Sequence, residues 1–195
     1  MILYIDVETT GLVKYVNGII ALAYIIENNE GVIVEKGKLE MNTFLYKTKV
    51  EAKALEVNGY SVEKIKSLPD PKTTILEFNR ILNKHFDGDK YKVIAYNSTF
   101  DTGFLQEWFN KLLPNTYWKI LDYKDIDPFA IIKVYQHLGI INTGKSQSLE
   151  AVCNHFGIEH DAHDCESDIS ATRELWLLLK TSLKEVRCCN DYQAM

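Results

Sequence analysis

The N-terminal run MILYIDVETTGL (residues 1–12) constrains the fold more than any other stretch, because it places two carboxylates inside an apolar strand. Alternate residues of a strand face the same side, so Asp6 and Glu8 are expected to point one way and Ile5 and Val7 the other. The apolar residues before Asp6 indicate a buried, central strand. Two unpaired carboxylates there would cost several kcal/mol each in lost hydration.

A cation is therefore expected between Asp6 and Glu8. The nearest basic side chain in the sequence is Lys14, beyond the turn at residues 9–11. A divalent metal ion held by carboxylate oxygens is the leading candidate for that cation. Other closely spaced acidic pairs occur in the chain, but none of them interrupts an apolar strand, and a solvated surface is their ordinary interpretation.

Length and charge limit the classes of protein that fit. The 195 residues suit one domain, expected over residues 1–186 with a C-terminal tail at 187–195. A net charge of −5 argues against a protein that grips long duplex DNA by phosphate contacts alone, but not against a nuclease that holds one strand end. No membrane span, secretory signal or paired cysteine spacing is visible, so the cytoplasm is the expected compartment.

The order of segments predicts a mixed sheet. Residues 18–28 and 31–40 are expected to form an antiparallel hairpin after the first strand, and residues 91–96 and 117–121 two further strands. Three early antiparallel strands, followed by parallel strands alternating with helices, indicate an α/β fold with helices on both faces of the sheet. The expected helices lie at residues 50–57, after Ser61, and at 72–86, 101–113, 128–138, 149–156 and 165–184.

Two later segments carry residues that could join the first strand. Asp101 lies on the first turn of an expected helix, where the helix dipole alone would favour a carboxylate. His163 and Asp168 are five residues apart and would diverge by about 140° inside a regular helix. They converge only if His163 lies in the loop before the helix and Asp168 on its second turn. Taken singly, each would be interpreted as a surface residue.

The segments DVETTGL, NSTFDTGFL and SLEAVCNHFGIEHDAHDCESD, in that order, resemble the motifs of the DEDDh branch of the DEDD exonuclease superfamily. That branch includes the proofreading subunits of bacterial replicative polymerases and ribonuclease T. The resemblance covers nearly the whole chain. It implies a ribonuclease H-like fold and hydrolysis from a 3′ end to nucleoside monophosphates. It also implies Asp6, Glu8, Asp101 and Asp168 as ligands of two Mg²⁺ or Mn²⁺ ions, with His163 as general base.

The resemblance also suggests how a strand end is held. Backbone N–H groups after the first strand can bind the terminal sugar or phosphate, and apolar side chains can wedge or stack against the last base. Ordinary core packing explains Leu12 and Phe104 equally well. Trp108 and Trp118 are expected in the core. The residues expected to contact substrate are Thr9, Gly11, Leu12, Asn97 and Phe104.

The sequence therefore predicts a free-standing, metal-dependent 3′–5′ exonuclease acting on single-stranded nucleic acid, with DNA favoured over RNA. An exoribonuclease that trims 3′ ends, and a catalytically silent nucleic-acid-binding module on the same fold, are the alternatives. A phosphatase would need a longer glycine-rich loop than residues 9–11 provide. The candidate partners are a single-stranded 3′ end, a polymerase and a second copy of the chain, and no membrane association is expected.

Overall fold

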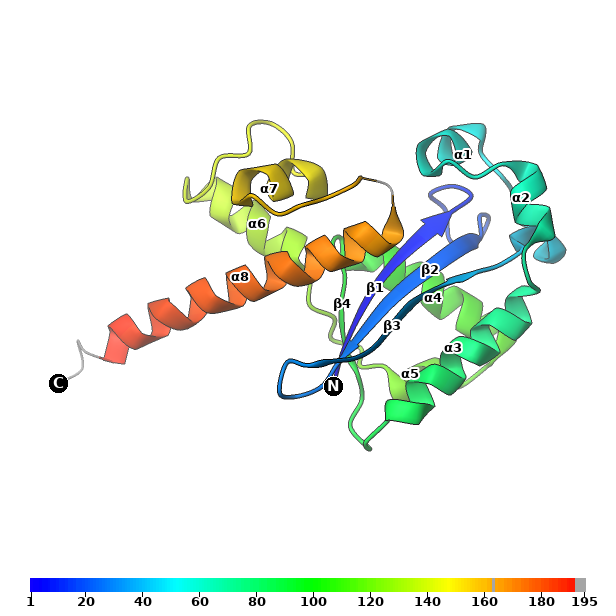
Figure 1. Cartoon of the computed structure of the whole chain (residues 1–195), viewed down its shortest axis with the longest axis horizontal. Helices are drawn as coiled ribbons and strands as arrows, with labels where there is room; N and C mark the ends of the chain where they lie inside the picture. The colour runs from blue at the N-terminus through cyan, green and yellow to red at the C-terminus, as the bar shows by residue number, and fades with distance from the viewer. Residues whose placement is uncertain (163, 192–195) are drawn as a thin grey trace.

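A four-stranded sheet forms the centre of the computed structural model, which describes residues 1–162 and 164–191. The strands are β1 (Ile2–Thr9), β2 (Ile19–Glu27), β3 (Ile33–Glu40) and β4 (Lys92–Ile94), in the order β3-β2-β1-β4 (Figure 1). Strand β1 is antiparallel to β2 and parallel to β4, and β2 is antiparallel to β3. The predicted hairpin and the central position of the first strand are confirmed.

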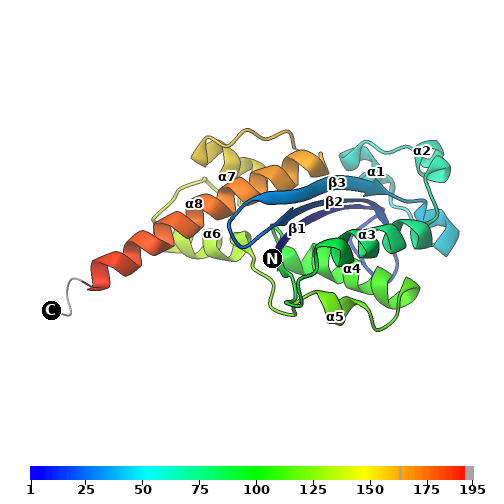
Figure 2. The same cartoon turned by 60° about the horizontal axis from the view of Figure 1, so that its bottom comes forward.

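Helices cover both faces of this sheet, as predicted. In Figure 2 the sheet is seen nearly edge-on, with α3, α4 and α5 below it and α8 along the other side. None of the helices that the structure describes is long and apolar enough to cross a membrane. The helices are η1 (Thr43–Tyr46), α1 (Ala52–Asn58), α2 (Val62–Ser67), α3 (Pro71–His85), α4 (Ser98–Leu112), α5 (Tyr117–Ile120), α6 (Pro128–His137), α7 (Leu149–Phe156) and α8 (Cys165–Asp191).

Polar side chains begin several of these helices where the sequence places them. The Ser61, Asp70, Asp127 and Ser148 side chains each accept a hydrogen bond from a backbone N–H in the first turn of the following helix. Such caps satisfy N–H groups that have no partner within the helix. Helix α4 differs, because Asn97 precedes it in a left-handed conformation (φ 65°) without a side-chain cap.

The two faces of β1 pack against different helices. Leu3, Ile5 and Val7 belong to a core cluster that includes residues of α3, α4 and α5. Tyr4 belongs to a second cluster, which includes Ile169 of α8. Because side chains alternate along a strand, Asp6 and Glu8 continue the Tyr4 face and therefore lie on the side of the sheet that α8 covers.

An ion pair at the far end of β2 fixes the direction of α8. Arg173 Nε donates to Glu27 Oε2 at 2.6 Å, and a second guanidinium nitrogen donates to the Gly31 carbonyl at 3.3 Å. The Glu27 side chain is 2% exposed. Because Arg173 lies on the helix that carries Asp168, this pair helps to hold the first turn of α8 beside β1.

Three predictions of secondary structure need correction. Residues 117–121 form helix α5 rather than a strand, and only Leu121 makes a parallel bridge, to Tyr91. Tyr117 and Ile120 are buried while Trp118 is 45% exposed, so burial there follows helical spacing. Strand β4 is shorter than predicted. Helix α8 continues to Asp191 through the start of the expected tail, whose residues 192–195 lie outside the described residues.

Candidate metal centre and active site

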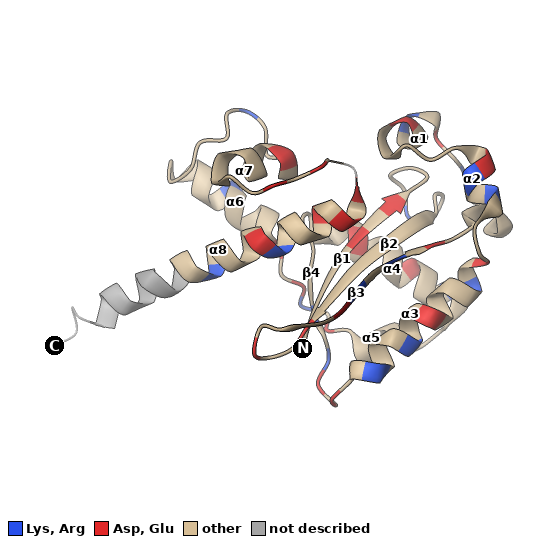
Figure 3. Cartoon of the chain, in the orientation of Figure 1, with Lys and Arg blue, Asp and Glu red and all other residues tan. Residues whose placement is uncertain are grey.

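Three carboxylates meet where the carboxyl end of β1 passes the start of α8. One oxygen each of Asp6, Glu8 and Asp168 lies within 4.8 Å of the others, a spacing that one metal ion can bridge. In Figure 3 the acidic residues of β1 lie next to those at the start of α8. The alternation of β1 explains why Asp6 and Glu8 share a face. Asp168 lies on the first turn of α8, not on the second turn as predicted.

The charges in this cluster oppose one another in the absence of a cation. Burial, followed by the charges of Asp101 and Asp168, raises the pKa of Asp6 well above its usual range. Burial and the charge of Asp168 raise the pKa of Glu8 to about 7. Both shifts mean that the ionised carboxylates are poorly compensated by the protein alone. Hard oxygen donors crowded in this way suit Mg²⁺ or Mn²⁺.

Asp101 approaches the cluster from α4 without belonging to the group of three. It is 4% exposed, and its Oδ1 accepts a hydrogen bond from the Val7 N–H at 3.0 Å. Burial raises the pKa of Asp101 to about 8, although the Val7 hydrogen bond acts in the opposite direction. The charge of Asp101 contributes to the raised pKa of Asp6. The second predicted segment therefore lies beside the first in space.

A lysine that sequence reasoning missed lies near the cluster. Lys38, on edge strand β3, lies 3.7 Å from Asp164 and partly offsets the raised pKa of Glu8. The prediction considered only cationic side chains close to Asp6 in sequence, and the β2–β3 hairpin brings Lys38 in from a distance. One lysine does not balance the carboxylates, because the pKa values of Asp6 and Glu8 stay raised beside it.

Of the two histidines in the segment before α8, the structure describes only one. His163, the predicted general base, lies outside the described residues. His160 was not among the predicted site residues, and its Nε2 lies only 2.5 Å from Asp168 Oδ1. Its side chain is 5% exposed. No sequence spacing marks His160, because the contact depends on how residues 158–161 lie against the first turn of α8.

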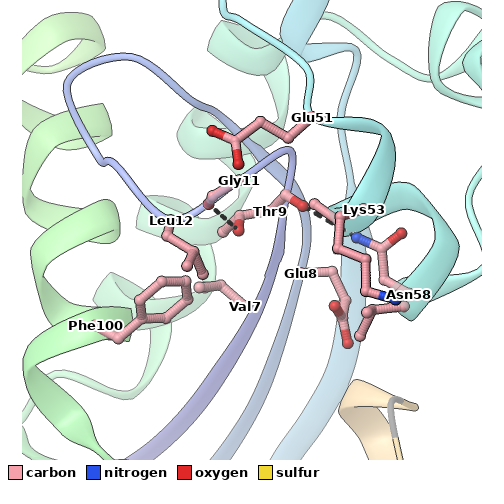
Figure 4. A pocket seen from close by; sticks show the side chains of 11 residues that line it. Val7, Glu8, Thr9, Gly11, Leu12, Glu51, Lys53, Asn58 and Phe100 are labelled. Carbon is pink, nitrogen blue, oxygen red and sulfur yellow. Dashed lines mark hydrogen bonds between the residues drawn. The ribbon is translucent and has the colours of Figure 1, made fainter.

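A cavity of about 350 Å³ opens beside Glu8 and continues away from the carboxylates (Figure 4). Val7, Leu12 and Phe100 form one apolar side, and Lys53 and Asn58 lie on the opposite side. The volume falls within the range of small-molecule sites in proteins. Leu12 is 77% exposed, so its predicted alternative role in the core is excluded.

The turn that presents Leu12 is held by hydrogen bonds from Asn17. The Asn17 side chain donates to the carbonyls of Thr10 and Lys49 and accepts from the Val13 N–H at 2.8 Å. A Cβ on Gly11 would lie 2.3 Å from the Asn17 amide nitrogen, so glycine is required there for packing. Asn58 donates to the Thr9 carbonyl at 3.0 Å, which ties α1 to the end of β1.

Two further hollows adjoin the first. One, of about 590 Å³, is lined by Asp6, Asp168 and Asn97 together with Tyr96 and Phe129. The other, of about 430 Å³, shares Leu12 and Phe100 with the cavity of Figure 4 and shares Asn97 with the second hollow. The carboxylates of the cluster therefore line two hollows, Glu8 the first and Asp6 with Asp168 the second.

The structure does not support base stacking by Phe104. Its ring is 1% exposed and packs on Phe100 with the ring centroids 4.9 Å apart. Phe100 is only partly buried and lines the cavity, so it offers the ring face that was expected of Phe104. The sequence could not distinguish the two, because they lie on adjacent turns of one apolar helix face.

One family of known proteins matches the chain from β1 to α8. The family model described as "Exonuclease", named for RNase T, matches residues 3–176. The PolC-type DNA polymerase III of Halalkalibacterium halodurans is 29% identical over 178 residues, which cover 90% of this chain and 11% of the polymerase. The chain therefore spans about a tenth of that relative.

Solved structures show the same fold. Exonuclease I of E. coli in complex with a dT13 oligonucleotide aligns with a TM-score of 0.78 and 18% identity over 98% of this chain and 42% of that chain. The zinc-bound form of the E. coli exonuclease I complex with single-stranded DNA aligns with a TM-score of 0.77 and 20% identity, over 93% and 40%. At these identities the likeness establishes the fold.

Proposed function

The chain belongs to the RNase T exonuclease family, and on that premise we propose that it is a 3′–5′ exonuclease of the DEDDh type. It releases nucleoside 5′-monophosphates from single-stranded nucleic acid, with DNA favoured over RNA. The single observation that carries this proposal is the cluster of Asp6, Glu8 and Asp168 beside a cavity large enough for one terminal nucleoside.

The carboxylates supply the ligands that such hydrolysis needs. Asp6, Glu8, Asp101 and Asp168 would hold two divalent ions, Mg²⁺ or Mn²⁺. The raised pKa values of Asp6, Glu8 and Asp101 are typical of carboxylates that a bound cation would neutralise. When bound, the two ions stabilise the charge that develops on the attacking and leaving oxygens of phosphorus. His163 accepts the proton of the attacking water, a role that an imidazole suits near neutral pH.

The terminal nucleoside occupies the cavity of Figure 4. Its base packs against Leu12 and Phe100, which present apolar surface on the same side. The backbone N–H groups at Thr9 and Gly11 lie at the rim and serve the terminal sugar. The scissile phosphate then lies at Glu8, and the preceding nucleotide continues past Asn97, which lines both neighbouring hollows.

The relatives favour DNA. The exonuclease I structures are bound to dT13 and to single-stranded DNA, and the curated relative is a DNA polymerase. A polymerase is accordingly the candidate protein partner. The alternative of an RNA 3′ end concerns the same cluster and cavity, and differs only in the sugar that the Thr9–Gly11 rim must accept.

A side-by-side degradation assay tests the proposal. The chain is mixed with 5′-labelled DNA and RNA single strands of identical sequence in Mn²⁺, and with the same strands labelled at the 3′ end. Stepwise shortening of the 5′-labelled DNA, with mononucleotide released at once from the 3′ label, is expected. Faster digestion of RNA would reverse the substrate order, and binding of intact strands without cleavage would establish a silent binding module.

Substitution of Asp6 supplies the matched control. Asp6→Asn keeps the shape of the side chain but removes one buried charge, so we expect the loss of Mn²⁺-dependent cleavage in a chain that stays folded without metal. Circular dichroism in EDTA checks the fold. His163→Ala is expected to slow cleavage by about 10²- to 10⁴-fold while metal binding persists. An unchanged rate in His163→Ala would remove that residue from the mechanism.

A further inference from the structure

We infer that His160 is a positioning residue that holds Asp168 in the geometry required for divalent-metal binding. The inference rests on the proposed metal site. It concerns a residue that is not among the five predicted catalytic residues, which are Asp6, Glu8, Asp101, His163 and Asp168. Nε2 of His160 lies 2.5 Å from Oδ1 of Asp168. Because a carboxylate accepts hydrogen bonds, the ring donates to this oxygen from Nε2.

The His160 ring faces Asp168 and is buried away from water. The His160 side chain is 5% exposed, and its Nδ1 is buried without a hydrogen-bond partner among the described residues. A buried, unsatisfied ring nitrogen is costly, and a histidine free to turn outward would hydrate it. The structure keeps the ring inside, with its one hydrogen bond directed at Asp168.

Both ends of the loop that carries His160 are anchored. On one side Ile158 is buried in the cluster between α7 and α8, and its N–H donates to the Cys153 carbonyl at 2.9 Å. On the other side the Asp161 N–H donates to Ser167 Oγ at 2.8 Å. His160 lies between these anchors, so the direction of its ring is set by the fold.

Electrostatic repulsion explains why Asp168 needs a positioning partner. Its carboxylate faces Asp6 and Glu8 within 4.8 Å, and in the absence of metal the three negative charges favour rotation of Asp168 out of the cluster. A hydrogen bond from His160 opposes that rotation and prepares the site for an ion. Partners of this kind, one step removed from the metal, typically change metal affinity or activity by 10- to 100-fold.

Metal binding can be measured without activity, which separates this inference from the proposed nuclease function. The affinity for Mn²⁺ alone is measured by isothermal titration calorimetry and by the electron paramagnetic resonance signal of free Mn²⁺. His160→Ala is expected to weaken Mn²⁺ binding by about 10- to 100-fold. His160→Gln, whose terminal amide can replace the Nε2 donor, is expected to recover part of that loss. His155→Ala, a histidine on the exposed side of α7, is the matched control and is expected to bind as the unaltered chain does.

The dependence of cleavage on metal concentration adds a second readout. In His160→Ala the Mn²⁺ concentration for half-maximal rate should rise, while the rate at saturating Mn²⁺ returns close to the original. Unchanged Mn²⁺ affinity in both His160 variants would overturn the inference while leaving the proposed function intact. A rate that stays low at saturating Mn²⁺ with unchanged affinity would also overturn it, in favour of a direct chemical role. If the unaltered chain binds no Mn²⁺, both proposals fail.

Discussion

Asp101 is the clearest case of a buried carboxyl whose charge the protein alone does not compensate. It is 4% exposed, on the first turn of α4, and the Val7 N–H is its one backbone donor from β1. Burial raises its pKa to about 8, so near neutral pH the metal-free chain either keeps a proton on this carboxyl or bears the cost of its charge. A charge on Asp101 therefore costs stability in the metal-free chain.

The first prediction concerns the stability of the metal-free chain as a function of pH. Glu8 and Asp101 have pKa values of about 7 and about 8 in the folded chain, above those of the unfolded chain at about 4. The folded chain therefore holds these protons more tightly. Their contribution to stability is complete below about pH 4 and is lost as the pH rises to about 8. In EDTA the melting temperature should fall across this range.

Asp101→Asn provides the comparison for that experiment. The amide oxygen can still accept from Val7, but the residue no longer titrates, so the fall in melting temperature between about pH 4 and 8 should be shallower than in the unaltered chain. Differential scanning fluorimetry in EDTA measures both curves. Parallel curves for the two proteins would show that Asp101 does not carry the raised pKa.

At the scale of elements, the ion pair between Arg173 and Glu27 connects α8 to the end of the sheet that lies away from the carboxylate cluster. Removal of one partner of a buried pair leaves the other charge uncompensated, at a cost of about 3 to 5 kcal/mol. We therefore expect Arg173→Met to lower the free energy of unfolding in urea by about that amount. The Glu27 side chain is 2% exposed, so in the Arg173→Met variant its charge would be left without a partner and out of contact with water.

Two further variants make this prediction specific. The double variant Glu27→Met with Arg173→Met removes both charges and should recover most of the lost stability, because apolar replacements of a whole buried pair are often neutral. Arg80→Met breaks the exposed pair with Glu77 on α3 and should leave the urea midpoint unchanged. If Arg173→Met behaves like Arg80→Met, the pair does not hold α8 in place.

The elements with strong local signals could be predicted from the sequence. The helices that follow Ser61, Asp70, Asp127 and Ser148 begin within one residue of their expected starts, because a capping side chain acts on N–H groups within its own turn. The prediction of a strand at residues 117–121 was wrong, because an apolar run this short fits a strand and a helical turn equally well. The prediction that Trp118 lies in the core was wrong for the same reason, since helical spacing turns this side chain outward.

In the candidate site, too, some residues could be predicted from local sequence patterns and others could not. Asp6 and Glu8 could be placed on one face by strand alternation alone, and the structure brings Asp168 to them. Lys38 and His160 could not be found, because their contacts depend on a hairpin and a loop whose side-chain directions no local pattern encodes. Phe100 and Phe104 are both aromatic and nearly adjacent, and only the packing of α4 decides which ring is exposed.

At the scale of the whole molecule, charge limits how nucleic acid can be held. The net charge is −5, so a long electrostatic track along the phosphate backbone is not expected. Recognition would rest on one or two phosphates near the carboxylate cluster and on the apolar cavity of Figure 4.

This arrangement predicts a weak response to salt. For about two phosphate contacts on a single strand, KM should rise by less than about tenfold between about 50 and 200 mM NaCl. The measurement is the initial rate of shortening of a labelled single strand at a series of salt concentrations in constant Mn²⁺. A rise of about 10³-fold would indicate six or more phosphate contacts, and therefore a binding track that the net charge does not suggest.

The three clustered carboxylates come from nearly opposite ends of the described chain, with Asp6 on its first strand and Asp168 on its last helix. A polypeptide still being translated consequently lacks the complete carboxylate cluster until α8 has left the ribosome. A fragment that ends before that helix would lack Asp168, so under the proposed function it would not cleave nucleic acid.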